Sequence, residues 1–322
     1  MSKAIRIERT GGPEVMRLVD HDPGAPGPGE LRIRNHAVGV NYIDVYFRTG
    51  AYPMPLPGGI GMEGAGVVEE VGPDVTGFAP GDRVAYAAGP PGAYAQVHNM
   101  PARSVVALPE AVGFEAAAAL MLKGMTVQYL FNRTVRLEPG QTILFHAAAG
   151  GVGLIAMQWA RAMGVTVIGT AGSEEKAELA RRHGCDHVIL YRSEDIVERV
   201  REITQGAMVP VVYDSVGKDT FDASLAALAP FGTMVCFGAS SGPVPPVPLT
   251  ALRGTLYLTR PSLLAYAERR EILESMAGGL FEMVGSGKVR PIIERRMPLA
   301  EAAQAHSDLE ARRTTGATLL QP

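Results

Sequence analysis

The chain has 322 residues, a formal net charge of −3, 47% hydrophobic residues and 20% charged residues. This length allows two domains with a sizeable buried core, and the composition is ordinary for a globular protein. Lysine and arginine form only short pairs, which are typical of solvated surfaces, so the charge pattern argues against a dedicated nucleic-acid surface.

Two cysteines, Cys185 and Cys236, are too few for a disulfide scaffold or a four-cysteine zinc site, and we expect free buried thiols. The N-terminal sequence MSKAIRIERTGG lacks the apolar core of a signal peptide. No apolar stretch reaches the roughly 18 residues that a membrane span requires. These observations predict a cytoplasmic protein.

The first third of the chain is rich in glycine and proline and is predicted to be a β-rich domain. Residues 31–40 and 93–100 alternate as strands do. Turn clusters at residues 19–30, 50–59 and 70–85 separate the short apolar runs. The pattern favours a distorted barrel or sandwich.

From about residue 113 the pattern changes to a helix over residues 114–134, followed by alternating strands and helices. The strands are expected at residues 142–147, 165–171, 187–191, 211–216 and 232–239. The helices are expected at residues 151–164, 173–184, 193–206 and 220–232, with Ser193 as the cap of the third. This alternation predicts a parallel sheet covered on both faces, and the fold class is therefore α/β.

The C-terminal part has two helical patterns, at residues 265–287 and 299–314, with a strand between them at residues 290–298. Residues 316–322 are expected to form a strand that returns to the first domain. Residues 252–260 alternate after a proline-rich loop and are predicted to be an edge strand.

The sequence HAAAGGVG lies between a predicted strand and a predicted helix, which is the context that a dinucleotide-binding loop requires. Gly150 is expected to permit a sharp turn, and Gly153 to let the helix approach the strand. The free amides of the helix N-terminus would face the pyrophosphate. The candidate phosphate-binding residues are Ala149, Gly150, Gly151, Val152 and Gly153. The alternative is that the small residues serve packing alone.

The end of the next strand favours NADPH over NADH. NAD-binding loops place an acid there, but this chain has Ala171. Gly172 and Ser173 can donate hydrogen bonds to a 2′-phosphate, and Lys176 adds a positive charge. Tyr191, at the end of the third strand, could flank the same phosphate. The alternative for Lys176 is an exposed helix residue without a ligand.

Several long motifs carry a resemblance to a known family. They are GVNYIDVYFRTGAYP, GMEGAGVVEEVG, LKGMTVQYL, HAAAGGVGLIAMQWA, VVYDSVGKDTF and TRPSL. With the order of the domains, they resemble the zinc-free quinone oxidoreductases of the medium-chain dehydrogenase/reductase superfamily over essentially the whole chain. The resemblance implies a GroES-like β-rich catalytic domain, residues 1–122 and 261–322, and a Rossmann NADPH-binding domain, residues 123–260. It also implies a homodimer that pairs the edge strands of the cofactor domains.

The resemblance also bears on metal binding. Zinc alcohol dehydrogenases of this superfamily have a cysteine where this chain has Asn41 and a histidine where it has Met62. We therefore expect no metal, and expect Glu63 to serve the structure. Without zinc an alcohol has no Lewis acid, whereas a quinone accepts hydride with little more than positioning and hydrogen-bond donors.

Asn41, Tyr46 and Tyr52 are the candidate catalytic residues, because they share one loop-rich stretch and can donate to or stack on a quinone. The alternative is that the tyrosines fill a small core. The resemblance implies further cofactor contacts at Asn41, Thr126, Tyr129, Ser215, Phe237, Gly238, Ser240, Arg260 and Arg312. Arg313 is an adjacent rival of Arg312.

The sequence therefore predicts metal-free reduction of a small-molecule quinone by NADPH. An alternative is an NADPH-dependent reductase of a polarised carbon–carbon double bond, in an enal or an enoyl thioester. A third hypothesis is a non-catalytic NADPH-binding or RNA-binding protein, against which the net charge and the absence of a basic cluster argue.

Overall fold

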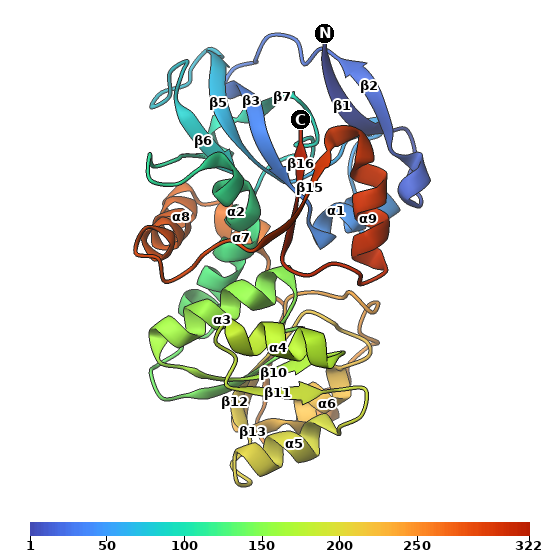
Figure 1. Cartoon of the computed structure of the whole chain (residues 1–322), viewed down its shortest axis with the longest axis vertical. Coiled ribbons are helices and arrows are strands. Elements are labelled where there is room, and N and C mark those ends of the chain that lie inside the picture. The colour runs from blue at the N-terminus through green and yellow to red at the C-terminus, as the bar shows by residue number, and fades with distance from the viewer. The chain divides into compact units, whose positions relative to one another are not determined.

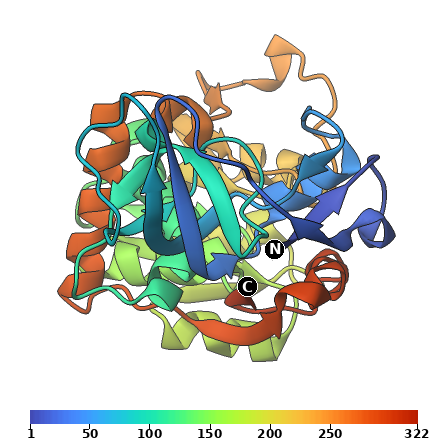
Figure 2. The same cartoon turned by 90° about the horizontal axis from the view of Figure 1, so that it is seen from above.

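The computed structural model describes residues 1–322, which form two compact units. Unit 1 comprises residues 1–125, 263–287 and 291–322, and unit 2 comprises residues 126–262 and 288–290. The sequence-based division fell at residues 122/123 and 260/261 and did not anticipate the return of residues 288–290 to unit 2. Both chain termini belong to unit 1 and lie near one another in two views (Figures 1 and 2).

Unit 2 contains a six-stranded parallel sheet in the order β11-β10-β9-β12-β13-β14. Its strands are β9 (Thr142–Phe145), β10 (Thr166–Ala171), β11 (His187–Leu190), β12 (Val209–Asp214), β13 (Leu228–Cys236) and β14 (Tyr257–Thr259). Its helices are α3 (Gly151–Met163), α4 (Glu174–Arg182), α5 (Ile196–Ile203) and α6 (Phe221–Ala226). Helices α3 and α4 cover one face of the sheet, and α5 and α6 the other (Figure 1). The predicted doubly wound sheet is confirmed, and its order reverses between β9 and β12, the position where such sheets bind nucleotides.

Three local predictions in unit 2 are wrong. The helix expected to reach residue 232 ends at Ala226, because Leu228 already pairs with Val209 in the sheet. The cap of α5 is Asp195, whose side chain accepts from the amide of Glu198, and not Ser193. The expected strand at residues 252–260 is reduced to β14, although it does form an edge of the sheet.

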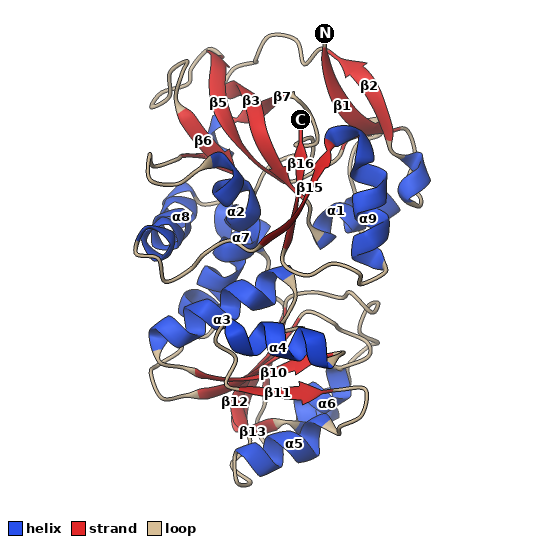
Figure 3. Cartoon of the chain, in the orientation of Figure 1, coloured by secondary structure: helices blue, strands red, loops and turns tan.

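Unit 1 contains a seven-stranded sheet and a three-stranded sheet (Figure 3). The larger sheet comprises β3 (Glu30–Gly39), β5 (Glu63–Val71), β6 (Arg83–Tyr86), β7 (Val97–Pro101), β8 (Val105–Ala107), β15 (Ile293–Pro298) and β16 (Ala317–Gln321). The smaller comprises β1 (Ser2–Ile7), β2 (Arg17–His21) and β4 (Gly58–Gly59). The expected return of the C-terminal residues is confirmed, since β16 pairs with β3 and β15.

The helices of unit 1 are α1 (Tyr42–Thr49), α7 (Leu263–Ala267), α8 (Arg270–Gly285) and α9 (Ala302–Glu310), while α2 (Phe114–Tyr129) spans the division and runs into a π-helix at Leu130–Thr134. Short 3-10 turns lie at Pro13–Val15, Ala102–Ser104, Leu249–Ala251 and Leu299–Glu301. The single helix predicted over residues 265–287 is two helices, with Arg269 as the cap of α8. None of the helices combines the length and apolar character needed to cross a membrane.

Candidate active site

The loop between β9 and α3 is shaped by Ala147, and the first turn of α3 packs against it through Gly153. Ala147 has a φ of 55°, in the left-handed region that favours glycine, whereas Gly150 has an ordinary φ of −77°. The sharp turn predicted for Gly150 is therefore made by Ala147, whose carbonyl accepts from the Gly150 amide at 2.9 Å. A Cβ on Gly153 would lie 2.4 Å from the Ala147 oxygen and 2.5 Å from the Ala148 oxygen, so only glycine fits there.

The first turn of α3 is suited to an anion. Its cap is Gly150, and no side chain hydrogen-bonds to the first amides of this 13-residue helix. Unsatisfied N–H groups and the positive end of the helix dipole together favour a phosphate. The helix therefore presents the amides of residues 151–153 at its positive end, while the Gly150 amide is bonded to the Ala147 carbonyl.

Four of the residues predicted to bind the 2′-phosphate lie together beyond β10 and β11. A Cβ on Gly172 would lie 2.7 Å from the hydroxyl of Tyr191, so the tyrosine ring passes close over the glycine. Ser173 caps α4 and accepts from the Lys176 amide at 3.3 Å, which places Lys176 in the first turn. The strand ends at Ala171 without an acid. The nearby Glu174 forms an ion pair with Arg181 at 2.6 Å.

The loops after β12 and β13 contact each other. A Cβ on Gly238 would lie 2.7 Å from the Ser215 oxygen, and the Ser240 amide donates to that oxygen at 3.2 Å. Phe237 packs on Phe145 with ring centroids 5.7 Å apart. The remaining unit 2 predictions differ in exposure: Arg260 is exposed after β14, whereas Thr126 and Tyr129 are buried in and at the end of α2.

Asn41 begins α1 and binds a buried carboxylate. Its side-chain nitrogen donates to Oε2 of Glu63 at 2.7 Å, and its side chain forms a reciprocal capping box with Asp44. The Lys123 ammonium lies 3.1 Å from the same Glu63 oxygen, and the Leu122 amide donates to Oε1 at 2.7 Å. Both oxygens of Glu63 are thus occupied by donors, as its expected structural role requires.

A chain of buried groups connects Asp44 to Arg48 through Tyr94 and His306. Oδ2 of Asp44 accepts from the Asn41 amide and from the Tyr94 hydroxyl, both at 2.9 Å, while Oδ1 has no partner. Tyr94 lies 3.0 Å from Nε2 of His306, whose Nδ1 faces a guanidinium nitrogen of Arg48 at 3.2 Å. Because Arg48 can only donate, Nδ1 accepts, so the imidazole proton is on Nε2 and points to Tyr94.

Asp44 and His306, two titratable members of this chain of groups, have perturbed pKa values. Burial raises the pKa of Asp44 to about 7, against the opposing hydrogen bonds from Asn41 and Tyr94. Burial, and then the charge of Arg48, lowers the pKa of His306 to about 3, so this histidine is neutral. Sequence reasoning missed Asp44, Tyr94 and His306, because only the fold brings them together.

The tyrosines predicted to contact substrate form one aromatic group on α1 and the following loop. The ring centroids of Tyr42 and Tyr46 are 5.3 Å apart, and those of Tyr46 and Tyr52 are 5.2 Å apart. Tyr52 also packs on Phe47, which belongs to the core of unit 1. The structure therefore brings Tyr46 and Tyr52 into contact. The alternative, that the tyrosines fill a small core, agrees with one face of Tyr52, which packs on the core residue Phe47.

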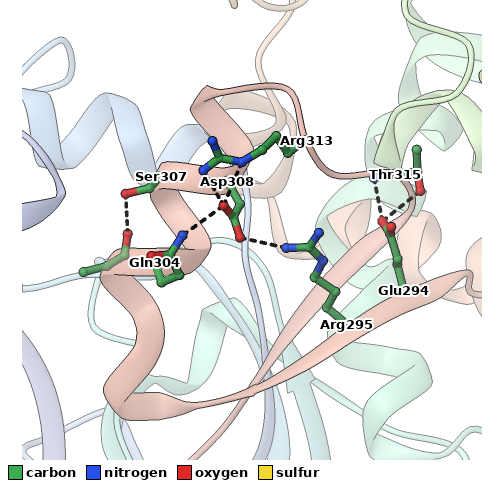
Figure 4. A network of polar contacts seen from close by, with 8 residues as sticks. Glu294, Arg295, Gln304, Ser307, Asp308, Arg313 and Thr315 are labelled. Carbon is green, nitrogen blue, oxygen red and sulfur yellow. Dashed lines mark hydrogen bonds and ion pairs between the residues drawn. The ribbon is translucent and has the colours of Figure 1, made fainter. Parts of the chain in front are cut away.

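The loop after α9 carries Arg312 and Arg313. Figure 4 shows Arg313 beside Asp308. Asp308 accepts from Arg313 at 2.5 and 3.0 Å, from Arg295 at 2.7 Å and from Gln304 at 2.9 Å. The hydrogen bond from Arg313 is the main cause of the lowered pKa of Asp308. Arg313 holds the loop through its hydrogen bonds to Asp308. Arg312 has a φ of 57° and an exposed side chain.

Two family models match the chain: "Alcohol dehydrogenase GroES-like domain" over residues 27–110 and "Zinc-binding dehydrogenase" over residues 151–279. A quinone oxidoreductase of Pseudomonas aeruginosa is 54% identical, and the alignment covers all of both chains. The chain belongs to the quinone oxidoreductases of the medium-chain dehydrogenase/reductase superfamily. The structure of the Escherichia coli quinone oxidoreductase complexed with NADPH, a member 48% identical, covers 99% of this chain and 100% of its own, with a TM-score of 0.97. A 2-haloacrylate reductase of Burkholderia is 44% identical over 100% of this chain and 99% of its own.

One of the two matching family models is described as a zinc-binding dehydrogenase, but the residues of this chain do not provide a set of zinc ligands. Asn41 donates to Glu63 instead of presenting a thiolate, and Met62 is a buried thioether. No group of three or more histidine, cysteine, aspartate or glutamate side chains is placed to hold a metal ion.

Proposed function

We propose that the protein reduces quinones with reducing equivalents from NADPH and without a metal ion. The observation that carries the proposal is the first turn of α3, which has no side-chain cap, in which Gly153 has no room for a Cβ, and which lies at the end of the loop after β9. This loop follows β9 at the position where the strand order reverses, which is where dinucleotides bind. Relatives that are named quinone oxidoreductases align with this chain over their whole length, and their name supports the substrate class.

NADPH, when bound, supplies the reducing equivalents. The chain holds its pyrophosphate with the amides of residues 151–153, because the Gly150 amide already donates to the Ala147 carbonyl. Ser173, Lys176 and Tyr191 hold the 2′-phosphate, since no acid stands at Ala171 to repel it. The remaining predicted cofactor contacts are Asn41, Thr126, Tyr129, Ala149, Gly172, Ser215, Phe237, Gly238, Ser240, Arg260 and Arg312.

The residues of α1, its cap and the loop that follows it act on the quinone. Tyr46 and Tyr52 provide aromatic faces and phenolic donors for the ring and its developing oxyanion. Asn41 is held by Glu63, so its amide is fixed before substrate arrives. Its side-chain nitrogen also donates to the Gly39 carbonyl at 3.4 Å, so Asn41 fixes the start of α1, from which Tyr46 faces the substrate.

Reduction of an activated double bond is a second candidate, which the 2-haloacrylate reductase favours. The two are separated by following NADPH absorbance with 1,4-benzoquinone, 2-chloroacrylate, a 2-alkenal and crotonyl-coenzyme A, with EDTA present. We expect rapid oxidation of NADPH with the quinone. Turnover of an alkene substrate alone would replace the proposal by the second candidate, with the same cofactor.

The phosphate assignment is tested by Lys176→Glu. The variant is expected to weaken NADPH binding at least tenfold more than NADH binding, because it reverses a charge beside the 2′-phosphate. Equal effects on the two cofactors would contradict the assignment.

We propose further that two copies pair through the free edge of β14. Apolar side chains stand exposed there: Tyr257 is 58% and Leu258 36% exposed, and Phe231 on β13 is 70% exposed. An unpaired apolar edge is normally covered. Light scattering is expected to give twice the chain mass, and a Leu258→Lys variant to shift the species toward the monomer; a monomeric wild type would refute the pairing.

A cytoplasmic location remains our proposal. It rests on Cys185 and Cys236, which are both buried and free, as expected in a reducing compartment.

A further inference from the structure

Four polar side chains are buried at neighbouring strand ends of unit 2. His146 follows β9, Thr170 lies near the end of β10, Asp214 ends β12, and Ser224 lies on α6. None is more than 2% exposed. Strands β9 and β12 are the adjacent pair at which the strand order reverses. The group therefore lies under the two loops that we propose to bind NADPH.

The hydrogen bonds of this group run in one direction. Asp214 accepts from the hydroxyls of Thr220 and Ser224, both at 2.7 Å, and from the amides of Val216 and Gly217. Four donors identify it as an acceptor-only carboxylate. Because the Ser224 proton points to Asp214, the Ser224 oxygen accepts from Nε2 of His146 at 2.9 Å.

The other side of the imidazole is then also determined. Burial lowers the pKa of His146, so the ring is neutral and its Nδ1 accepts from the Thr170 hydroxyl at 3.1 Å. The Thr170 oxygen in turn accepts from the amide of Ala147 at 3.2 Å, and the Thr170 carbonyl accepts from the amide of Ala148 at 3.0 Å. Thr170 thus holds two successive amides around the left-handed Ala147.

The direction of these bonds excludes a nucleophilic serine. A nucleophile donates its proton to histidine, and an acid orients that histidine. Here the Ser224 proton goes to Asp214 and the imidazole donates to the Ser224 oxygen. The group is built to hold positions, and it joins the Ala147–Ala148 amides at one end to the Val216–Gly217 amides at the other.

We propose that His146, Thr170, Ser224 and Asp214 form a positioning relay that fixes the pyrophosphate loop and the 215–217 loop as one unit before NADPH binds. This inference rests on the proposed function, because it assigns both loops to the cofactor. Loss of a link at either end loosens the pyrophosphate loop, although neither His146 nor Ser224 touches the α3 amides. None of the four side chains is a catalytic residue.

The test compares Thr170→Val, which removes the hydroxyl at nearly constant shape, with Thr170→Ser, which keeps it. NADPH binding is measured by fluorescence titration without substrate, and steady-state kinetics give the KM values for NADPH and quinone. Thr170→Val is expected to raise the Kd and KM for NADPH about tenfold with the quinone KM unchanged, since two buried groups lose their partner. Thr170→Ser is expected to stay within about twofold of wild type.

Ser224→Ala probes the far end of the relay. It is expected to raise the NADPH Kd severalfold, and the double variant Thr170→Val/Ser224→Ala to bind about as weakly as the worse single variant. Additive effects, or wild-type NADPH affinity in both single variants, would overturn the relay. If Thr170→Val does not fold, Ser224→Ala decides alone.

Amide hydrogen exchange separates this inference from the proposed function. Ser224→Ala is expected to speed exchange at Ala147 and Ala148 in the protein without cofactor. Unchanged exchange there would overturn the relay. Failure of the wild type to bind NADPH, with faster exchange in the variant, would instead refute the assignment of these loops to NADPH.

Discussion

Asp44→Asn is expected to stabilise the protein more at high pH than at low pH. Burial raises the pKa of Asp44 from an ordinary value of 3.8 to about 7. A rise of about three pH units corresponds to ~4 kcal/mol, at about 1.36 kcal/mol per unit. The folded state binds this proton more tightly than the unfolded state, so ionisation opposes folding. The penalty is absent below pH 3.8, grows as the pH rises and is complete above about pH 7.

The isosteric amide removes this titration and keeps an oxygen that can accept from Asn41 and Tyr94. At pH 5 the penalty in the wild type is roughly 1–2 kcal/mol, and at pH 8 it is ~4 kcal/mol. The difference in free energy of unfolding between Asp44→Asn and wild type should therefore grow by roughly 2–3 kcal/mol from pH 5 to pH 8. Urea unfolding followed by far-UV circular dichroism at pH 5, 6.5 and 8 measures this difference.

Asp22→Asn is the matched control, because Asp22 is an exposed carboxylate of the same unit that accepts from one amide. Its difference from wild type should stay within ~0.5 kcal/mol over the same pH range. Tyr94→Phe removes a donor to Asp44 and should move the Asp44 pKa still higher. A difference between Asp44→Asn and wild type that does not vary with pH would refute the reasoning.

Three further substitutions have defined outcomes. Gly153→Ala is expected to raise the NADPH Kd at least tenfold in a fluorescence titration, because its Cβ would lie 2.4 Å from the Ala147 oxygen, and an unchanged Kd would contradict this. Glu63→Gln leaves the Lys123 ammonium buried without its counter-ion and should lower the free energy of unfolding by about 3–5 kcal/mol. Adding Lys123→Met should restore more than half of this loss, whereas additive losses in the double variant would refute the pairing of Lys123 with Glu63. Gln205→Gly places a glycine after α5 at a φ of 52°, where other residues are strained. The variant should raise the urea midpoint and increase the free energy of unfolding by up to ~1 kcal/mol, whereas a lower midpoint would show that Gln205 is not strained.

The features that the sequence predicted correctly have local causes. The parallel sheet follows from alternating periods, and the tight turn between β9 and α3 from small residues between a strand and a helix. The end of α6 was missed because the segment around Leu228 has helical spacing, yet pairing with Val209 outweighs that propensity. The cap of α5 was missed because Ser193 and Asp195 are both good caps, and only the register of the helix selects between them.

The buried polar groups could not be predicted because they join distant segments. Asp44 and Tyr94 are 50 positions apart, and Tyr94 and His306 are 212 positions apart. Each residue alone is compatible with many surroundings. Similarly, the motif predicted a sharp turn in the loop between β9 and α3, but the hydrogen bonds of Thr170 place the left-handed residue at Ala147 and not at Gly150.

Asn41 is one of the donors that satisfy the buried carboxylate of Glu63. A buried carboxylate needs donors or a cation, and Glu63 obtains them from Asn41, Leu122 and Lys123. Zinc members of the superfamily have a cysteine at this position. Asn41→Cys should nevertheless bind no zinc, because Met62 supplies no second strong ligand and Lys123 remains on the carboxylate. The variant should instead lose about 1–3 kcal/mol of stability through the missing donor to Glu63. Elemental analysis after dialysis and thermal unfolding with and without Zn²⁺ measure both effects. One equivalent of bound zinc that raises the Tm would refute the view that the Lys123 ammonium, with Asn41 as a neutral donor, satisfies Glu63 in place of a metal ion.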